Sequence, residues 1–420
     1  MNFPPCHYLD NILHIENVPL DRIAKFYGTP LYLYSTEALR NAYHAYEKAL
    51  IKQKSLICYA VKANSNIAIL NLFAKLGAGF DIVSIGELKR VIAAGGSPSK
   101  TVFSGVGKTK EEIRFALEHN IHCFNIESEA ELLRIQSIAK ELGKVAPISL
   151  RINPDVDAKT HPYISTGLKT NKFGLAYDSV LKTYQNAKLL DHIAIKGIDC
   201  HIGSQITEIS PYLDALDKVL DMVELLEKQS IPIEHIDLGG GLGIQYQDEQ
   251  PPTHADLYEK IIARLHSRNH HRKTILIEPG RSLVGNAGVL LTEVQYTKTG
   301  EAKNFIIVDA AMNDLARPAM YEAYHEMITV KESSNKGLTA DVVGPICETG
   351  DWLGKDRQLD VSESDLIAIL SSGAYGMTMS SNYNTRGRAA EVMIDGDEHY
   401  LIRQRESVEY LLSLENIAPI

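Results

Sequence analysis

The sequence predicts an α/β fold in which a (β/α)8 TIM-type barrel is followed by a smaller, mainly β domain. The first observation is a series of eight short apolar runs with helical periodicity between them. Eight strands, each followed by a helix, in about 250 residues is the number expected for this barrel. The second is a change beyond about residue 282, where apolar runs follow one another without long helices. The third is that polar residues and glycines collect directly after the barrel runs, at the strand ends that form the mouth of a barrel.

The expected barrel strands are short apolar runs of the length typical of buried strands. They lie near residues 56–61, 79–83, 101–103, 122–126, 147–152, 195–201, 233–237 and 274–278. The clearest helix covers 211–229, with leucines and valine on one face and charges on the other. Ser210 is its expected N-cap and Pro211 its first residue. An open doubly wound sheet is the main alternative, but its glycine-rich turn follows the first strand, whereas here the glycines follow the seventh.

The chain beyond residue 282 has the pattern of a β domain. Its expected strands cover 289–294, 305–308, 340–343, 366–370, 391–394 and 400–402. Asp395-Gly396, between the last two, is a strong hairpin-turn signal. Residues 1–29 predict a short strand and a helix that precede the barrel pattern. We therefore expect a barrel domain over 30–282 and a β domain over 283–420, on which residues 1–29 pack.

The composition is that of an ordinary globular protein and disfavours several classes of function. Of 420 residues, 45% are hydrophobic and 23% are charged, and the net charge of −10 argues against general nucleic-acid binding. The five cysteines, without CxxC spacing, argue against a disulfide framework or a zinc cluster, so no metal is expected. No apolar run reaches the length of a membrane span, and the N-terminal residues lack the features of a signal peptide. We expect a cytoplasmic protein that does not bind membranes.

The apolar run 56–61 ends at a lysine, Lys62. A lysine beside an apolar run is unfavourable unless something uses its amine. At the C-terminal end of a barrel strand it would face the mouth, where a desolvated amine can react with an aldehyde. The alternative is a lysine whose stem lies along the strand and whose charge reaches water, which is the commoner arrangement for a single lysine. The residues at the other strand ends favour the first interpretation.

Polar side chains at two other strand ends fit a phosphorylated aromatic aldehyde. Asp81 lies in the second strand, and His201 and Ser204 follow the sixth. His201 offers a flat ring for stacking on a pyridine, although a single histidine is more often a core residue. Ser204 offers a hydroxyl group to a phosphate.

Glycines and a carboxylate follow the last two strands. The segment Gly239–Gly243 would leave backbone N–H groups open to a phosphate. Phosphate sites after strands 7 and 8 recur in barrels. The alternative is that these glycines only form a tight turn. Glu278 ends the eighth strand and needs a partner if it is buried. A protonated pyridine nitrogen is one candidate, and that pairing makes the cofactor a strong electron sink. An ion pair with Arg281 is the other.

These segments together resemble a known family. The stretches 59–64, 201–205, 239–243 and 278–281 resemble the barrel motifs of the alanine racemase-like, fold-type III pyridoxal phosphate-dependent decarboxylases. Five further stretches resemble one member of this group, the diaminopimelate decarboxylases. They are residues 151–155, 160–167, 317–325, 347–351 and 373–377. The resemblance runs in order over about residues 28–410, and Ile85, where the family often has glycine, departs from it.

The resemblance implies a cofactor, a reaction and a role for each matching residue. The cofactor is pyridoxal 5'-phosphate, and the reaction is decarboxylation of meso-2,6-diaminopimelate to L-lysine and carbon dioxide, in a homodimer with shared active sites. Lys62 would bind the cofactor covalently, and the full set of cofactor contacts would be Lys62, Asp81, His201, Ser204, Gly240, Gly241, Glu278, Gly280, Arg281 and Tyr375. Substrate contacts would be Arg281, Arg317, Tyr321, Glu348 and Tyr375. Cys347 would protonate the product from the neighbouring subunit, with Lys62 as the alternative proton donor.

Competing interpretations remain open from the sequence. The nearest is a decarboxylase of the same fold that acts on ornithine, arginine or lysine. Arg317 and Glu348 distinguish diaminopimelate from these substrates, because an arginine suits the distal carboxylate that ornithine, arginine and lysine lack. Without its motif, Arg317 would be taken as a surface or interface charge. A more remote alternative is a non-catalytic regulatory homologue that binds the cofactor.

Overall fold

The computed structural model of the chain describes residues 6–157, 171–335 and 337–419. The chain divides into two compact units. The barrel unit comprises residues 42–244 and 250–282, and the β unit comprises the chain up to residue 41, residues 245–249 and the chain from 283 onward. The motif at 160–167 that contributes to the family resemblance lies outside the described residues.

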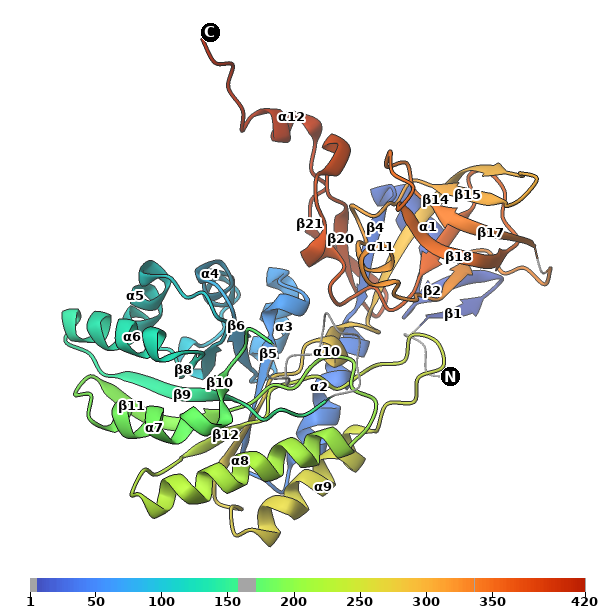
Figure 1. Cartoon of the computed structure of the whole chain (residues 1–420). Coiled ribbons are helices and arrows are strands. Elements are labelled where there is room, and N and C mark those ends of the chain that lie inside the picture. Colours follow the sequence, from blue (N-terminus) through green and yellow to red (C-terminus); the bar gives the residue numbers. More distant parts are fainter. Residues whose placement is uncertain (1–5, 158–170, 336, 420) are drawn as a thin grey trace. The chain divides into compact units, whose positions relative to one another are not determined.

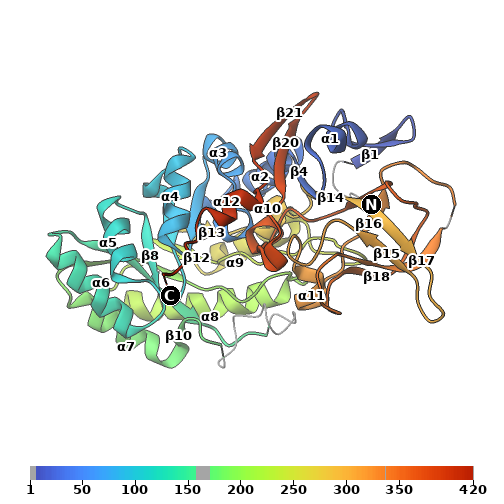
Figure 2. The ribbon, with the colours of Figure 1, turned by 90° about the horizontal axis from the view of Figure 1, so that it is seen from above.

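The barrel unit contains a closed ring of eight parallel strands, which confirms the predicted fold class. The strands are β5 (Ser55–Ala60), β6 (Gly79–Ile82), β7 (Thr101–Phe103), β8 (Cys123–Ile126), β9 (Ala146–Asn153), β11 (Ile193–Asp199), β12 (His235–Asp237) and β13 (Thr274–Ile277). The pairings of β13 with β5 and of β8 with β9 close the ring. A short strand, β10 (Leu175–Ala176), pairs with β9 outside the ring. Helices connect successive strands around the outside (Figure 1), and Figure 2 shows them from a second direction.

Serine and threonine side chains begin several of the connecting helices. Ser84, Thr109, Ser128 and Thr253 each accept a hydrogen bond from the third N–H of the helix that follows, which satisfies a donor that the helix itself cannot. The helices that follow β5 to β13 around the ring are α3 (Ile67–Lys75), α4 (Ile85–Ala93), α5 (Lys110–Glu118), α6 (Glu129–Glu141), α7 (Tyr177–Lys188), α8 (Ser210–Lys228), α9 (His254–Ser267) and α10 (Arg281–Val284). The helix α2 (Thr36–Leu50) precedes β5.

Helix α8 confirms the helix predicted over 211–229 but begins differently. We expected Ser210 to cap it; instead Ile209 occupies the cap position without a side-chain hydrogen bond, and Ser210 is the first helical residue. The physical reason is that Ile209 already has helical dihedral angles, with φ −83° and ψ −32°, so the chain turns one residue earlier. Pro211 lies in the first turn, where its missing N–H breaks no helical hydrogen bond.

Three cysteines lie in the core of the barrel unit. Cys58, Cys123 and Cys200 are at most 2% exposed and free. Burial raises the pKa of all three thiols well above the ordinary value, so they stay uncharged. They are therefore unreactive residues of the core.

The β unit is built on a nine-stranded sheet and a three-stranded sheet. The larger sheet has the order β18-β17-β15-β14-β4-β20-β21, with β19 between β14 and β16. Its strands are β4 (Leu31–Ser35), β14 (Gly288–Lys298), β15 (Phe305–Val308), β16 (Met327–Thr329), β17 (Leu338–Val343), β18 (Trp352–Leu359), β19 (Leu366–Ile369), β20 (Ala390–Asp395) and β21 (Glu398–Arg403). The smaller sheet comprises β1 (Cys6–Leu9), β2 (Ile12–Ile15) and β3 (Val18–Pro19), and the unit's helices are α1 (Leu20–Tyr27), α11 (Arg317–Tyr321) and α12 (Val408–Leu412).

Strand β4 belongs to the β unit, although the predicted barrel domain began at residue 30. It pairs antiparallel with β14 and parallel with β20. Leu31, Tyr32, Leu33 and Tyr34 are all fully buried. A strand that is buried on both faces fits the middle of a sheet. Residues 31–35 therefore belong to the β unit and not to the barrel domain in which we had placed them.

Strands β4, β16 and β18 were not predicted, residues 1–29 contain three short strands where one was expected, and one turn is displaced. Strand β16 has only three residues, and in β18 three consecutive charged residues, Lys355, Asp356 and Arg357, interrupt the apolar pattern. The hairpin of β20 and β21 is confirmed, but its two loop residues are Gly396 and Asp397, because Asp395 still pairs with Glu398. Gly396 has φ 65°, a conformation that favours glycine.

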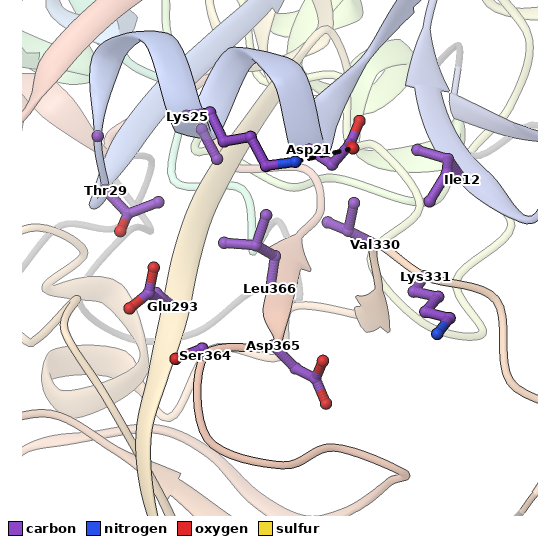
Figure 3. A pocket seen from close by; sticks show the side chains of 12 residues that line it. Ile12, Asp21, Lys25, Thr29, Glu293, Val330, Lys331, Ser364, Asp365 and Leu366 are labelled. Carbon is purple, nitrogen blue, oxygen red and sulfur yellow. Dashed lines mark ion pairs between the residues drawn. The ribbon is translucent and has the colours of Figure 1, made fainter.

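A pocket of about 360 Å³ lies in the β unit beside α1. Figure 3 shows Lys25 of α1 reaching Asp21 across one side of the pocket, and the distance between their charged atoms is 3.8 Å. Glu293, Lys331 and Asp365 supply further charges around it. None of the predicted site residues lines this pocket, so it is separate from the chemistry that the sequence predicts.

Lys108 is a buried charge that joins three elements of the barrel unit. Its side chain is 1% exposed. Nζ donates to the carbonyl oxygens of Gly105 and Asn125, both at 2.8 Å, and to Glu131 Oε1 at 2.7 Å. Glu131 also accepts from the N–H of Glu127 at 2.9 Å. The pair thus connects the loops after β7 and β8 to α6.

We expect Lys108→Met to lower the free energy of unfolding by about 3–5 kcal/mol, because it leaves the buried carboxylate of Glu131 without a counter-charge. Urea unfolding followed by circular dichroism measures the change. Lys110→Met, at an exposed position of α5, is the matched control and should change stability by less than about 0.5 kcal/mol. A loss below about 1 kcal/mol for Lys108→Met would contradict this role.

Candidate active site

The lysine after β5 lies where the sequence predicted it. Lys62 is in a single 3₁₀ turn, Val61–Ala63, that directly follows β5. Its side chain is 36% exposed, and Nζ forms an ion pair with Asp81 of β6, whose side chain is fully buried. A Cβ on Gly280 would lie 3.0 Å from Ala63 Cβ, so glycine lets the segment after β13 approach this turn closely. The amine is therefore fixed at the barrel mouth yet reachable by a ligand.

His201, after β11, is a neutral ring that faces the glycine segment. Its Nδ1 accepts a hydrogen bond from the N–H of Gly240 at 3.1 Å. Burial, and the positive charges of Arg151 and Lys62, hold the pKa of the imidazole well below its ordinary value. The ring is therefore uncharged at neutral pH and offers a flat face for stacking.

The glycines after β12 are required by close packing. A Cβ on Gly240 would lie 2.1 Å from Glu278 O, and one on Gly241 would lie 2.4 Å from Gly203 O. The N–H of Gly239 donates to Asp237 Oδ1 at 2.9 Å. Among the described residues, outside the helices and strands, the N–H of Gly241 donates no hydrogen bond to a backbone carbonyl. The run is thus a tight turn, which was the alternative, and the contact of its N–H groups with a phosphate stays a prediction.

Glu278 is buried and receives hydrogen bonds from a residue that directly follows β7 and from a residue of β8. It is 6% exposed, and Oε1 accepts from Ser104 Oγ at 3.3 Å and from Asn125 Nδ2 at 3.2 Å. Burial, and then the charges of Asp237, Asp81 and Asp199, raise the pKa of its carboxyl well above the ordinary value. The Arg281 guanidinium donates instead to Ser204 Oγ, at 2.9 Å from Nη2, so the alternative of a Glu278–Arg281 ion pair is wrong.

Sequence reasoning missed a ring of polar residues inside the barrel. Arg151 of β9 is 6% exposed and pairs with Glu127 at 2.8 Å and with Asp199 at 3.9 Å. The missed residues are Ser104, Asn125, Glu127, Arg151, Asp199 and Asp237. Each lies within or directly after a predicted strand, and a polar residue in a run otherwise made of buried apolar residues was the signal that could have found them.

Five predicted residues lie in the β unit. Arg317 of α11 is 7% exposed; Nη1 lies 2.8 Å from His325 Nε2, and the guanidinium carbon lies 4.6 Å from the centre of the Tyr246 ring. Arg317 is thus a buried cation, and the alternative of a surface charge is wrong. Tyr321 ends α11, and Tyr375 has φ 56°.

Cys347 and Glu348 are adjacent and solvent-exposed. Cys347 N–H donates to Asn384 Oδ1 at 3.1 Å, and the hydroxyl of Tyr383 donates to Glu348. These contacts fix the backbone and the carboxylate and leave the Cys347 thiol exposed.

The barrel residues fit a phosphorylated pyridine aldehyde. The structure brings together Lys62, Asp81, His201, Ser204, Gly240, Gly241, Glu278, Gly280 and Arg281 at the C-terminal ends of the barrel strands. They supply a primary amine, a neutral ring, an anion cradle and a buried carboxyl that can bind a ring nitrogen. This donor set matches the aldehyde, the ring face, the phosphate and the pyridine nitrogen of that ligand.

Comparisons with known proteins agree with this chemistry. Residues 36–285 match the family described as "Pyridoxal-dependent decarboxylase, pyridoxal binding domain". The "Diaminopimelate decarboxylase" of Pseudomonas aeruginosa is 56% identical over 98% of this chain and 99% of that protein, and that of Aquifex aeolicus is 47% identical over 97% of each. Within the described residues, every helix is too short or too polar to cross a bilayer.

Two solved structures extend the comparison to the whole chain. The diaminopimelate decarboxylase from M. jannaschii in co-complex with L-lysine has a TM-score of 0.94 at 42% identity and covers 99% of this chain and 98% of its own. The enzyme from Helicobacter pylori complexed with L-lysine has a TM-score of 0.90 at 43% identity and covers 94% of this chain and 98% of its own.

Proposed function

The chain belongs to the diaminopimelate decarboxylase family of pyridoxal-dependent enzymes, and we propose that it removes one carboxylate of meso-2,6-diaminopimelate as carbon dioxide and leaves L-lysine. Its cofactor is pyridoxal 5'-phosphate. The observation that carries the proposal is the amine of Lys62 at the barrel mouth together with the buried carboxyl of Glu278. The reaction is a step of lysine biosynthesis.

The barrel residues are proposed to hold the cofactor and to keep its ring protonated. Lys62 forms the covalent link, and Asp81 holds the amine in place by its ion pair. His201 packs on one ring face as an uncharged group. Glu278 holds a proton at the ring nitrogen, while Ser204, Arg281 and the Gly241 N–H bind phosphate. When bound, pyridoxal phosphate supplies a protonated ring that accepts the electron pair left by the departing carboxylate.

The β-unit residues are proposed to bind the substrate and to return a proton. Arg317 suits a carboxylate because its planar fork can donate two parallel hydrogen bonds, and its stacking on Tyr246 fixes that fork. Glu348 would accept from the distal amine. Tyr321 and Tyr375 would add further contacts, and Cys347 would give a proton to the carbon that lost the carboxylate. Burial of Arg317 favours a specific anion partner over a general surface charge.

We also propose a homodimer in which Cys347 completes the active site of the neighbouring subunit, and a cytoplasmic location. The exposed thiol of Cys347 supports the first proposal, and the five free cysteines, which suit a reducing compartment, support the second.

Cys347→Ala should lower kcat by about 10²–10⁴-fold, the contribution expected of a positioned proton donor, while the cofactor stays bound. Steady-state kinetics and the absorbance of the bound cofactor measure the two effects. Cys6→Ala, at the other cysteine that is not fully buried, is the control and should retain full activity. Unchanged turnover in Cys347→Ala would transfer the proton-donor role to Lys62.

Subunit mixing tests the shared site. Lys62→Ala and Cys347→Ala protein, each with at most about 1% of the wild-type kcat, should together regain up to about a quarter of the wild-type activity, since half of randomly mixed dimers are hybrids with one complete site. No regained activity after verified subunit exchange would contradict the shared site.

Product analysis tests the proposed reaction. The protein with pyridoxal phosphate is given meso-diaminopimelate, ornithine, arginine and lysine in separate reactions, and amines are separated by chromatography. We expect lysine from the first and no product from the others. A diamine or agmatine from one of the others would keep the cofactor site and overturn the assignment of Arg317 and Glu348. No product from any substrate, with cofactor bound, would favour a regulatory homologue.

A further inference from the structure

Three carboxyl groups lie close together inside the barrel, and the proposed reaction uses only one of them, that of Glu278. Asp199 ends β11, Asp237 ends β12 and Glu278 directly follows β13, so adjacent strands bring them to one level. One ligand atom of each lies within 4.8 Å of the others. Their exposed fractions are 1%, 0% and 6%. We call these three residues the carboxyl trio.

The positive charges around the carboxyl trio are too few to neutralise it. Arg151 lies 3.9 Å from Asp199 but is also paired with Glu127, and Lys62 is paired with Asp81. The imidazole of His201 is neutral, because its pKa is held low by burial. The charged and titratable groups that interact with the trio are Lys62, Asp81, Glu127, Arg151, Cys58, Cys123 and Cys200.

Two oxygens of the carboxyl trio lack a donor unless one carboxyl carries a proton. Among the described residues, Asp199 Oδ1 and Asp237 Oδ2 are buried and accept no hydrogen bond from a fixed donor. A buried acceptor without a donor is unfavourable, whereas two carboxylates that share a proton satisfy each other. The pKa values agree, since burial raises that of Asp237 to about 6 and those of Asp199 and Glu278 well above their ordinary values.

We propose that Asp199, Asp237 and Glu278 share one proton in the cofactor-free protein, and that this proton passes to the ring nitrogen when a pyridine ring binds against Glu278. An O–H bond on the trio breaks and an N–H bond forms, so binding takes no proton from water. Asp237 is a positioning residue that acts on the ring through Glu278. The identity of the ring rests on the proposed function, but the shared proton belongs to the chain alone.

Infrared difference spectroscopy tests the shared proton without substrate or turnover. The cofactor-free protein at pH 7 should show the carbonyl stretch of a protonated carboxyl group, shifted in D2O and lost when pyridoxal phosphate is added. Asp237→Asn and Asp199→Asn, which keep the shape of the side chain, should each alter the band. Asp191→Asn, at an exposed position, is the matched control and should leave it unchanged.

The pH dependence of cofactor affinity is the second readout. From about pH 6.5 to 8 the affinity of the wild type should stay nearly constant, because no proton is exchanged with water. In Asp237→Asn it should fall by up to about tenfold per pH unit, the limit for uptake of one proton. Fluorescence titration with pyridoxal phosphate measures both.

Three results would overturn the proposal. They are absence of the carboxyl band at pH 7, a band that both amide variants leave unchanged, and specific retention of Mg²⁺ or Zn²⁺ by the cofactor-free wild type but not by Asp237→Asn, which would assign the trio to a cation. Failure of the proposed function is distinguishable, because it appears in product analysis of the wild type, whereas the band is measured before any substrate is added.

Discussion

Lys62→Ala should abolish covalent attachment of the cofactor and lower kcat by at least about 10⁴-fold, beyond what loss of a single proton-transfer group explains. The reason is structural: Lys62 is the amine that directly follows β5 at the barrel mouth, and it is held there by the buried carboxylate of Asp81. Without it, the phosphate and ring contacts remain but no amine is placed to bond the aldehyde.

The measurement is steady-state decarboxylation together with borohydride reduction and intact mass. Lys75→Ala, at an exposed position near the end of α3, is the matched control and should behave as the wild type. If Lys62→Ala still gains the mass of one reduced cofactor at a single site, another lysine forms the link and the assignment is wrong.

Glu278→Gln should lower kcat by about 10²-fold or more, the lower end of the effect of a positioned proton-holding group. An amide cannot keep the ring nitrogen protonated, so the ring becomes a weaker electron sink. KM should change little, because no substrate contact is assigned to Glu278. Glu234→Gln, an exposed residue before β12, is the control.

The same variant should make the cofactor-free protein more stable at neutral pH. The pKa of Glu278 is raised in the folded chain by burial and by Asp237, Asp81 and Asp199. A carboxyl with a raised pKa disfavours folding as pH rises above the unfolded value of about 4.3. Glu278→Gln removes this effect, so its melting temperature should exceed that of the wild type at pH 7 and approach it at pH 4. A lower melting temperature at pH 7 would contradict the raised pKa of the Glu278 carboxyl.

Much of the barrel could be predicted because apolar runs and barrel strands coincide. The run that ends before Lys62, the glycines after β12 and the carboxylate after β13 stand out from sequence alone, since each breaks a strand pattern with a residue that needs a special environment. The strand β18 could not be found in this way, because three consecutive charged residues, Lys355 to Arg357, interrupt its apolar pattern.

Other features depend on contacts between residues that are distant in the chain. The predicted barrel domain began at residue 30, and only the pairing of β4 with β14 and β20 places this strand in the β unit. Asp199 and Asp237 each look like an ordinary strand-end residue. Their role becomes visible only when neighbouring strands bring both carboxyl groups against Glu278.

The most direct test of the account is to locate the cofactor on the wild-type chain. The protein with pyridoxal phosphate is reduced with borohydride and digested, and the labelled peptide is sequenced by mass spectrometry. We expect one reduced pyridoxyl group on Lys62, in the peptide that contains the 3₁₀ turn after β5. A label on another lysine, or no label on protein that forms lysine from diaminopimelate, would contradict it.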